Sequence, residues 1–140
     1  MPLLARKTTI LCKAESSYGS DASPSGSANA VLVRNLSIEP VQSDEVSRDL
    51  VRGYLGNYET LLANTRATVS FEVELAGSGS AGTAPRWSPA MLACGTEITT
   101  VSSTSNTYAP ISASMGSCSV YYNTDGVNHA LTGCRGTFSI

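Results

Sequence analysis

The stretch that decides the fold runs from residue 117 to residue 132: Ser117-Cys-Ser-Val-Tyr-Tyr-Asn-Thr-Asp-Gly-Val-Asn-His-Ala-Leu-Thr132. Asp125 and Gly126 stand between two runs that contain valine, tyrosine and leucine. An Asp-Gly pair in this position is the strongest short-range hairpin signal, because both residues tolerate the positive φ angles of a type I′ turn. The sequence therefore predicts two antiparallel strands here.

A two-residue turn also determines which residues of the two strands face each other. The expected pairs are Thr124 with Val127, Tyr122 with His129, Val120 with Leu131, and Cys118 with Gly133. In this register Cys134 points to the opposite face from Cys118, so we expect no disulfide between them. We interpret His129, the only histidine, as a structural partner of Tyr122 rather than a base or a metal ligand.

The clearest further strand covers residues 66–75, where apolar and polar side chains alternate strictly. Such alternation is typical of an antiparallel strand with one face on the core and one face in water. The apolar face would hold Val69, Phe71, Val73 and Leu75, and the wet face Thr68, Ser70, Glu72 and Glu74. We also expect strands at 6–13 and 30–39, and two weak strands around a turn within 96–109. Pro40 limits the residues after the 30–39 strand to a sheet edge or a turn.

One helix is predicted, over residues 88–94. Ser88 can cap it, Pro89 fits the first helical position, and Gly95 fits the position just past its end. Residues 14–29 and 76–85 are rich in serine and glycine and are expected to be loops. The first is long for a compact domain, so we expect it to become ordered on a neighbouring molecule. The predicted class is mainly β, a sandwich or partly closed barrel with one short flanking helix and long loops.

Composition excludes several functions. Nine basic and eleven acidic residues give a net charge of −2, which disfavours tight binding of nucleic acid. No stretch approaches the roughly 18–20 apolar residues of a membrane span. The four cysteines show no CxxC spacing, and the opening residues do not resemble a secretory signal, so we expect free thiols and no zinc site.

Catalytic motifs are not recognised in this sequence. Residues 77–82 match G-x-G-x-x-G superficially, but no helix begins directly after them, so we interpret them as a flexible loop. Glu72 and Glu74 could suggest acid–base chemistry, although two carboxylates on the wet face of a strand are more often ordinary surface. The sequence therefore favours a protein that is not an enzyme and needs no cofactor. The densest charge cluster, residues 44–52, fits either a short helix or an extended arm with pairable charges.

Several stretches carry a resemblance to a known family. They are residues 3–7, 45–56, 71–85 continuing into 90–95, and 120–136. Together they resemble the tail tube (major tail) proteins of long, non-contractile-tailed bacteriophages, including those of Mu-like transposable phages. The resemblance implies a β-sandwich or β-barrel core with a flanking helix, as in type VI secretion tube proteins. It also implies rings, usually hexameric, that stack into a tube around a channel for the phage genome.

The resemblance further implies a structural virion protein that lies in the phage tail and is assembled in the host bacterial cytoplasm. Its implied partners are other copies of itself, the tape measure, tail terminator and tail tip proteins, and phage DNA that passes non-specifically through the lumen. No cofactor and no membrane are implied. Members of the family usually continue past the equivalent of Ile140. We therefore expect residues 1–140 to be a single tail-tube domain, either of a short member or truncated relative to longer relatives.

Candidate site residues are implied by the same resemblance. The strand at 66–75 would line the lumen through Thr68, Ser70, Glu72 and Glu74. Contacts between subunits or rings would involve Tyr18, Gly19, Asp21 and Pro24 from the long loop, and Asp44, Glu45, Arg48, Asp49 and Arg52 from the charge cluster. Two alternatives remain open. One is another phage ring protein, such as a tail terminator or head–tail connector; the other is a non-viral β-sandwich binding module, which should expose an aromatic platform.

Overall fold

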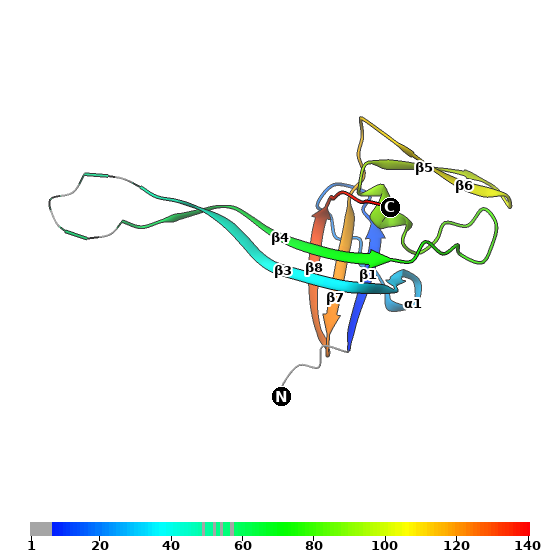
Figure 1. Cartoon of the computed structure of the whole chain (residues 1–140), viewed down its shortest axis with the longest axis horizontal. Coiled ribbons are helices and arrows are strands. Elements are labelled where there is room, and N and C mark those ends of the chain that lie inside the picture. Colours follow the sequence, from blue (N-terminus) through cyan, green and yellow to red (C-terminus); the bar gives the residue numbers. More distant parts are fainter. Residues whose placement is uncertain (1–6, 49, 52, 54, 57) are drawn as a thin grey trace. The chain divides into compact units, whose positions relative to one another are not determined.

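The computed structural model describes residues 7–48, 50, 51, 53, 55, 56 and 58–140 and is mainly β, as the sequence predicted (Figure 1). Residues 34–72 form one compact unit, and the described residues before 34 form another together with 73–140. The elements are β1 (Thr8–Ala14), α1 (Gly26–Asn29), β2 (Ala30–Val31), β3 (Val33–Val46), β4 (Leu61–Val73), α2 (Ser88–Leu92), β5 (Thr96–Val101), β6 (Ser105–Pro110), β7 (Cys118–Thr124) and β8 (Val127–Cys134).

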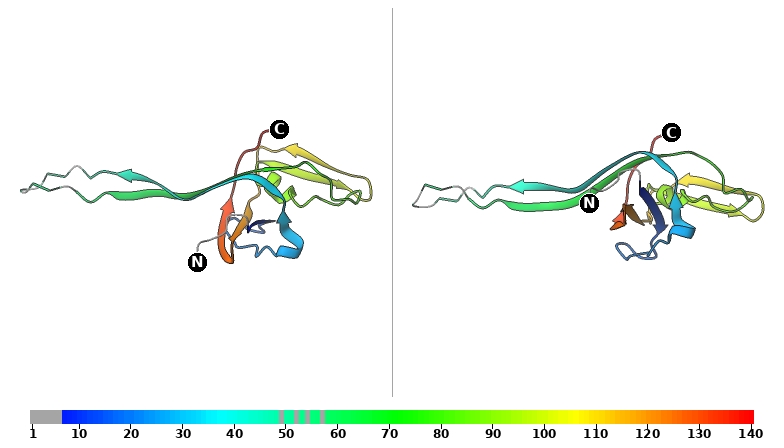
Figure 2. Two further views of the ribbon diagram at one scale, coloured as in Figure 1. Left: turned by 60° about the horizontal axis from the view of Figure 1, so that its bottom comes forward. Right: turned by 90° about the horizontal axis from the view of Figure 1, so that it is seen from below.

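The larger unit is built on a four-stranded antiparallel sheet with the order β2-β1-β7-β8, which Figure 2 shows from two further directions. β1 pairs with β7 along its whole length, from Thr8 opposite Thr124 to Ala14 opposite Cys118. β5 and β6 form a separate two-stranded sheet, and so do β3 and β4. Of the two architectures that the sequence left open, sandwich and partly closed barrel, the described residues do not form the barrel, because none of their sheets is closed.

The core lies on one face of the four-stranded sheet, where α2 packs against β1 and β7. Side chains alternate along β1, so Ile10 and Cys12 are both fully buried. Complete burial of an isoleucine stabilises a fold by about 1.5–3 kcal/mol. Among the described residues, the buried apolar side chains are Ile10, Cys12, Val31, Ala93, Cys118, Val120 and Tyr122. This core is small, and much apolar surface remains outside it.

The β7–β8 hairpin confirms the turn and most of the register predicted from Asp125-Gly126. Both turn residues have positive φ angles, 48° and 92°, as a type I′ turn requires. Tyr122 lies opposite His129, and the two rings stack with their centroids 4.4 Å apart. The structural interpretation of His129 agrees with this contact.

The register fails at the far end of the hairpin, where Cys118 lies opposite Cys134 and not opposite Gly133. A β-bulge causes the shift, because residues 132 and 133 of β8 together oppose Ser119 of β7. Gly133 has a φ angle of +67°, which glycine adopts without strain. The two cysteines therefore share a cross-strand position, although both are free thiols.

The strand expected at 30–39 is divided in two. β2 pairs with β1, whereas β3 pairs with β4, and Leu32 between them is 94% exposed. Pro40 lies inside β3 and does not end it. A proline is tolerated there because each strand of a two-stranded sheet has one open edge, where the missing N–H is not needed.

The described residues contain two short helices instead of the single expected one. α2 covers Ser88–Leu92, but Trp87 occupies the N-cap position and no side chain caps the helix. Ser88 is buried at the first helical position, so its predicted capping role is wrong. Gly95 comes shortly after the helix with a φ angle of +80°, as expected after a helix end. α1 arises in the segment predicted to be a loop, and neither described helix is long and apolar enough to span a membrane.

The bulge at Gly133 gives a direct test of the fold. We expect Gly133→Ala to lower the free energy of unfolding by about 1–2 kcal/mol, because an alanine is strained at this positive φ angle. Its Cβ would also lie 3.4 Å from the Tyr18 ring. Urea unfolding monitored by circular dichroism measures the change.

Gly26→Ala is the matched control for this substitution. The added Cβ meets no atom within 4 Å, and the backbone lies in α1 outside the left-handed region. This variant should be neutral or slightly stabilised. An equal loss in both variants would contradict the role of the bulge.

Candidate assembly surfaces

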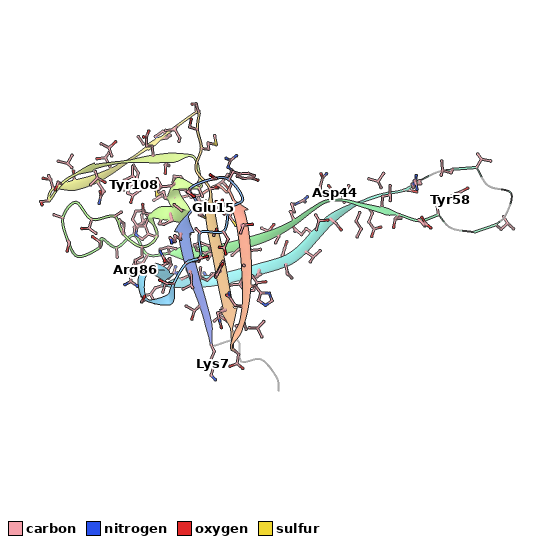
Figure 3. The ribbon with its side chains drawn as sticks, turned by 180° about the vertical axis from the view of Figure 1, so that it is seen from behind. Lys7, Glu15, Asp44, Tyr58, Arg86 and Tyr108 are labelled. Atoms are coloured by element: carbon pink, nitrogen blue, oxygen red, sulfur yellow. The ribbon has the colours of Figure 1, made fainter. Side chains whose placement is uncertain are left out.

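The side chain of Glu15, directly after β1, joins three parts of the larger unit (Figure 3). Its Oε2 atom accepts hydrogen bonds from the Ser117 hydroxyl at 2.6 Å and the Gly19 backbone N–H at 2.9 Å. Its Oε1 atom accepts from the Ser119 hydroxyl at 2.8 Å and the Gly133 backbone N–H at 2.7 Å. The carboxylate thus links the 15–24 segment to β7 and to the bulge in β8.

Asp21 makes a second attachment for the same segment. Its carboxylate accepts a 2.5 Å hydrogen bond from the Tyr121 hydroxyl, and the Ala22 N–H donates to the Ser119 hydroxyl at 3.0 Å. Pro24 is buried. The segment is therefore ordered by its own chain, which corrects the expectation that it becomes ordered only on a neighbour.

The charge states of these carboxylates depend on their hydrogen bonds. Partial burial raises the pKa of Glu15, but the hydrogen bonds donated to its carboxylate outweigh this effect and leave the pKa below its ordinary value. The Tyr121 hydrogen bond, with smaller contributions from Ser23, lowers the pKa of Asp21. Both groups are ionised at neutral pH, so the attachments are intact there.

Three predicted contact residues of this segment lie at the surface. Tyr18 is 68% exposed, and Gly19 and Asp21 are exposed beside it. The guanidinium of Arg135 lies 4.5 Å from the centre of the Tyr18 ring and also donates to the Met115 carbonyl at 3.0 Å. Of the four residues predicted from the long loop, only Pro24 is inaccessible.

The smaller unit is the β3–β4 hairpin, and one set of its side chains is joined by polar contacts. Arg34 pairs with Glu72 at 2.8 Å, and Asn35 donates to the same carboxylate at 2.9 Å. These contacts, with the Asn35 hydrogen bond contributing most, lower the pKa of Glu72. Further along the hairpin, Thr68 donates to Gln42 at 2.8 Å. Glu72 is thus a paired surface carboxylate.

The charge cluster adopts the extended alternative as far as it is described. β3 continues to Val46, and Asp44 contacts Asn64 at 3.1 Å and Arg66 at 3.8 Å (Figure 3). Glu45 and Arg48 are exposed. Asp49 and Arg52 lie outside the described residues.

The strand predicted to line a lumen is confirmed as a strand with alternating exposure. Val69, Phe71 and Val73 are half-buried, whereas Thr68, Ser70 and Glu72 are exposed. The strand ends at Val73, so Glu74 and Leu75 lie beyond it. The structure therefore brings three of the four predicted lumen residues together on one face.

Large apolar side chains are exposed on the same hairpin. Val41 is 71% exposed and Leu62 is 66% exposed, and Val46 and Leu61 are also exposed. Two strands alone are at best marginally stable in water. Within the described part of the chain, β3 and β4 pair only with each other, so both outer edges remain open. Open edges readily accept strands from other chains.

A pocket with a volume of about 480 Å³ lies between the 77–83 loop and β6. The rings of Trp87 and Tyr108 lie 5.3 Å apart in its wall, and Trp87 donates its indole N–H to the Ala76 carbonyl at 2.9 Å. The loop has neither helix nor strand, as predicted, but Ser78 donates to the Thr83 carbonyl within it. The lining residues are Gly77, Ser78, Gly79, Ser80, Ala81, Gly82, Thr83, Pro85, Trp87, Thr104, Ser105, Asn106 and Tyr108.

Three of the four cysteines have raised thiol pKa values. A hydrogen bond with Cys12 and burial raise the pKa of Cys118, and burial raises the pKa of Cys134 to about 11. Burial also raises the pKa of Cys94. These thiols are protonated at neutral pH, and a protonated thiol is a poor nucleophile and a poor metal ligand. No group of three or more metal-ligating side chains occurs among the described residues.

The structure therefore defines a mainly β protein whose distinctive features are open sheet edges and exposed apolar side chains, as in a subunit of an assembly. The chain belongs to the phage tail tube protein family, whose sequence profile matches residues 5–140. This is a family of structural virion proteins and not of enzymes. Comparison with curated proteins and with solved structures found no significant match.

Sequence reasoning missed Glu15, whose carboxylate accepts four hydrogen bonds. The available signal was a single carboxylate placed where a strand enters a Ser- and Gly-rich segment. Its partners Ser117 and Gly133 are more than 100 residues away along the chain, so only the β1–β7 pairing brings them together.

The pKa of Glu15 predicts how the attachment depends on pH. Because the folded pKa lies below the unfolded value, its contribution to stability is complete above the unfolded pKa and is lost as the pH falls through the folded pKa. We expect the protection factors of the amides in residues 16–23, which correct for the intrinsic slowing of exchange in acid, to fall on acidification before the β1–β7 pairing is lost. Hydrogen exchange with mass spectrometry measures both regions.

Glu15→Gln tests the same attachment at neutral pH. The amide nitrogen cannot accept the hydrogen bonds on its side, so we expect a loss of about 1 kcal/mol in the free energy of unfolding. The protection of residues 16–23 should then be reduced already at neutral pH, and any further loss on acidification should come from the remaining Asp21 attachment. Unchanged exchange in this variant would contradict the role of Glu15.

Proposed function

We propose that this chain is the repeating subunit of a phage tail tube, in which six copies form a ring and rings stack around a central channel for DNA. Family membership supports the tube subunit. The observation that carries the finer proposal is the β3–β4 hairpin, which has open edges and exposed apolar side chains. A hairpin of this kind needs partners to be stable, and identical copies can supply them.

Edge pairing between copies would complete the structure. A strand added at an open edge gains main-chain hydrogen bonds, and a closed ring of such pairs leaves no free edge. The half-buried face of Val69, Phe71 and Val73 would face the protein, and the exposed face would line the lumen. The barrel absent from the described part of the single chain would then be formed by the ring.

The lumen face would be suited to passage of DNA rather than to binding it. Thr68 and Ser70 are uncharged, and Glu72 is neutralised locally by Arg34. Since affinity for nucleic acid comes largely from basic contacts to phosphate, a face with paired charges would not retain the polyanion.

Other exposed residues are available for contacts between subunits or rings. They are Tyr18, Gly19 and Asp21 on the attached segment, and Glu45 and Arg48 on the hairpin. Further partners would be the tape measure, tail terminator and tail tip proteins of a long, non-contractile, Mu-like phage tail. Assembly would take place in the host cytoplasm.

Leu62→Asp tests the hairpin as an assembly surface. An unpaired carboxylate buried at an interface costs about 3–5 kcal/mol, so the concentration needed for assembly should rise at least about 100-fold. Sedimentation velocity and negative-stain electron microscopy over a concentration series measure assembly. Far-UV circular dichroism checks that the larger unit stays folded.

Thr99→Asp places the same charge on an exposed polar position of β5, outside the hairpin, and serves as the control. It should assemble like the unchanged chain. Equal assembly of both variants would contradict the proposal, and single rings that never stack would indicate a tail terminator or connector instead.

The lumen assignment has its own test. We expect a phage carrying Glu72→Lys with Glu74→Lys to assemble normal tails but to deliver DNA poorly, because a new cation at position 72 would face the lumen and hold phosphate, with a second cation just beyond the strand end. Glu97→Lys, on an exposed position of β5, is the control and should leave infectivity unchanged. Normal infectivity of the double variant, with tails intact, would remove the lumen assignment.

A further inference from the structure

We propose that the pocket between the 77–83 loop and β6 receives residues 137–140 of a neighbouring copy, with Phe138 packed on the Trp87–Tyr108 ring pair. The inference rests on the proposed tube function and identifies one contact between subunits. Pocket and segment both belong to the larger unit, which carries one of each per copy.

The pocket is chemically suited to an uncharged peptide. None of its lining side chains carries a charge, and its aromatic wall is bordered by serine, threonine and asparagine. A volume of about 480 Å³ is in the usual range of ligand sites, about 300–1,000 Å³. The Tyr108 hydroxyl is buried and has no hydrogen-bond partner among the described residues, so one polar atom beside the pocket is unsatisfied in the single chain.

The segment Thr137-Phe-Ser-Ile140 has matching chemistry and is not part of any described helix or strand. Gly136 is held by its N–H to the Ala93 carbonyl at 3.2 Å, and this is the last backbone hydrogen bond along the described chain. Phe138 is 48% exposed and Ile140 is 92% exposed. The segment is uncharged in its side chains, and its apolar and polar residues alternate, as a strand with one buried face requires.

The sheet beside the pocket can accept such a strand. β6 supplies Ser105, Asn106 and Tyr108 to the lining, and in the described chain it pairs only with β5. Peptides recognised by strand addition gain affinity from main-chain hydrogen bonds and specificity from pockets for alternate side chains. Phe138 would occupy the aromatic wall while the Thr137 and Ser139 side chains point away.

A second copy is the occupant favoured by this arrangement. The lining of the pocket does not include residues 137–140 of the same chain, so the two complementary surfaces of one copy are unoccupied by each other. Surfaces that differ yet match on one molecule make head-to-tail contacts, which generate rings or open stacks. Rings and stacks of copies are both features of a tube.

Trp87 is the only tryptophan of the chain, so its fluorescence reports on this pocket alone. We would measure its emission maximum and its quenching by acrylamide from dilute to concentrated protein, with sedimentation velocity on the same samples. We expect a blue shift and at least a twofold fall in the quenching constant as oligomers form. Phe138→Asp should abolish both changes, whereas Val127→Asp, at a residue of similar exposure in β8, should not.

A capped Gly-Thr-Phe-Ser-Ile peptide, matching residues 136–140, gives a readout that does not need assembly. Added to Phe138→Asp protein, it should shift the Trp87 emission saturably, and the Gly-Thr-Ser-Ser-Ile peptide should not. Three results would overturn the inference: oligomers in which Trp87 stays fully quenchable, protection of Trp87 already in the dilute monomer, or no saturable response to the peptide. The first of these leaves the tube proposal intact, whereas an unchanged chain that stays monomeric at every concentration while the Phe138→Asp protein binds the peptide would count against the tube alone.

Discussion

The pairing of β1 with β7 is the interaction on which the rest of the larger unit depends. It joins residues 8–14 to residues 118–124 and places Ile10 and Cys12 in the core beside Val120 and Tyr122. It also carries Glu15 to the point where β7 begins and β8 bulges. The carboxylate can satisfy four donors there because the bulge releases the Gly133 N–H from the strand ladder. A strand pairing, a bulge and an ordered loop are thus parts of one arrangement.

The core around the β1–β7 pairing buries only a few apolar residues, so many others are left for contacts with other molecules. The buried core is small, while the β3–β4 hairpin and residues 137–140 leave large apolar side chains in water. A monomer would gain nothing from such exposure, but a subunit can bury these side chains against other copies. The low fraction of charged residues, 14%, agrees with extensive contact surfaces, where desolvation of charge is costly.

The sequence was informative where structure depends on neighbouring residues. Asp125-Gly126 determined the turn and three cross-strand pairs, and the alternation around Phe71 predicted the exposure pattern of β4. The predictions were wrong where the structure depends on contacts between residues that are distant in sequence. The position of Cys118 depends on a bulge whose N–H is bound by Glu15, 118 residues away from Gly133 in sequence. The division of strand 30–39 depends on two different pairing partners, which local periodicity does not encode.

On the candidate surfaces too, features set by neighbouring residues were predictable, and contacts between distant residues were not. Exposure of Thr68, Ser70 and Glu72 was predictable from period-two alternation, but the Arg34 partner of Glu72 was not, because it lies on the other strand. The segment at 15–24 was expected to need a neighbour, since its serines and glycines gave no sign of the hydrogen bonds that Ser119 and Tyr121 supply.

The central claim, that the β3–β4 hairpin is completed by other copies of the chain, is tested most directly by hydrogen exchange of residues 33–46 and 61–73. We expect fast exchange in dilute monomer and strong protection in assembled protein, while β1 and β7 stay protected in both. Protection of the hairpin already in the monomer, or fast exchange within assembled tubes, would contradict the claim.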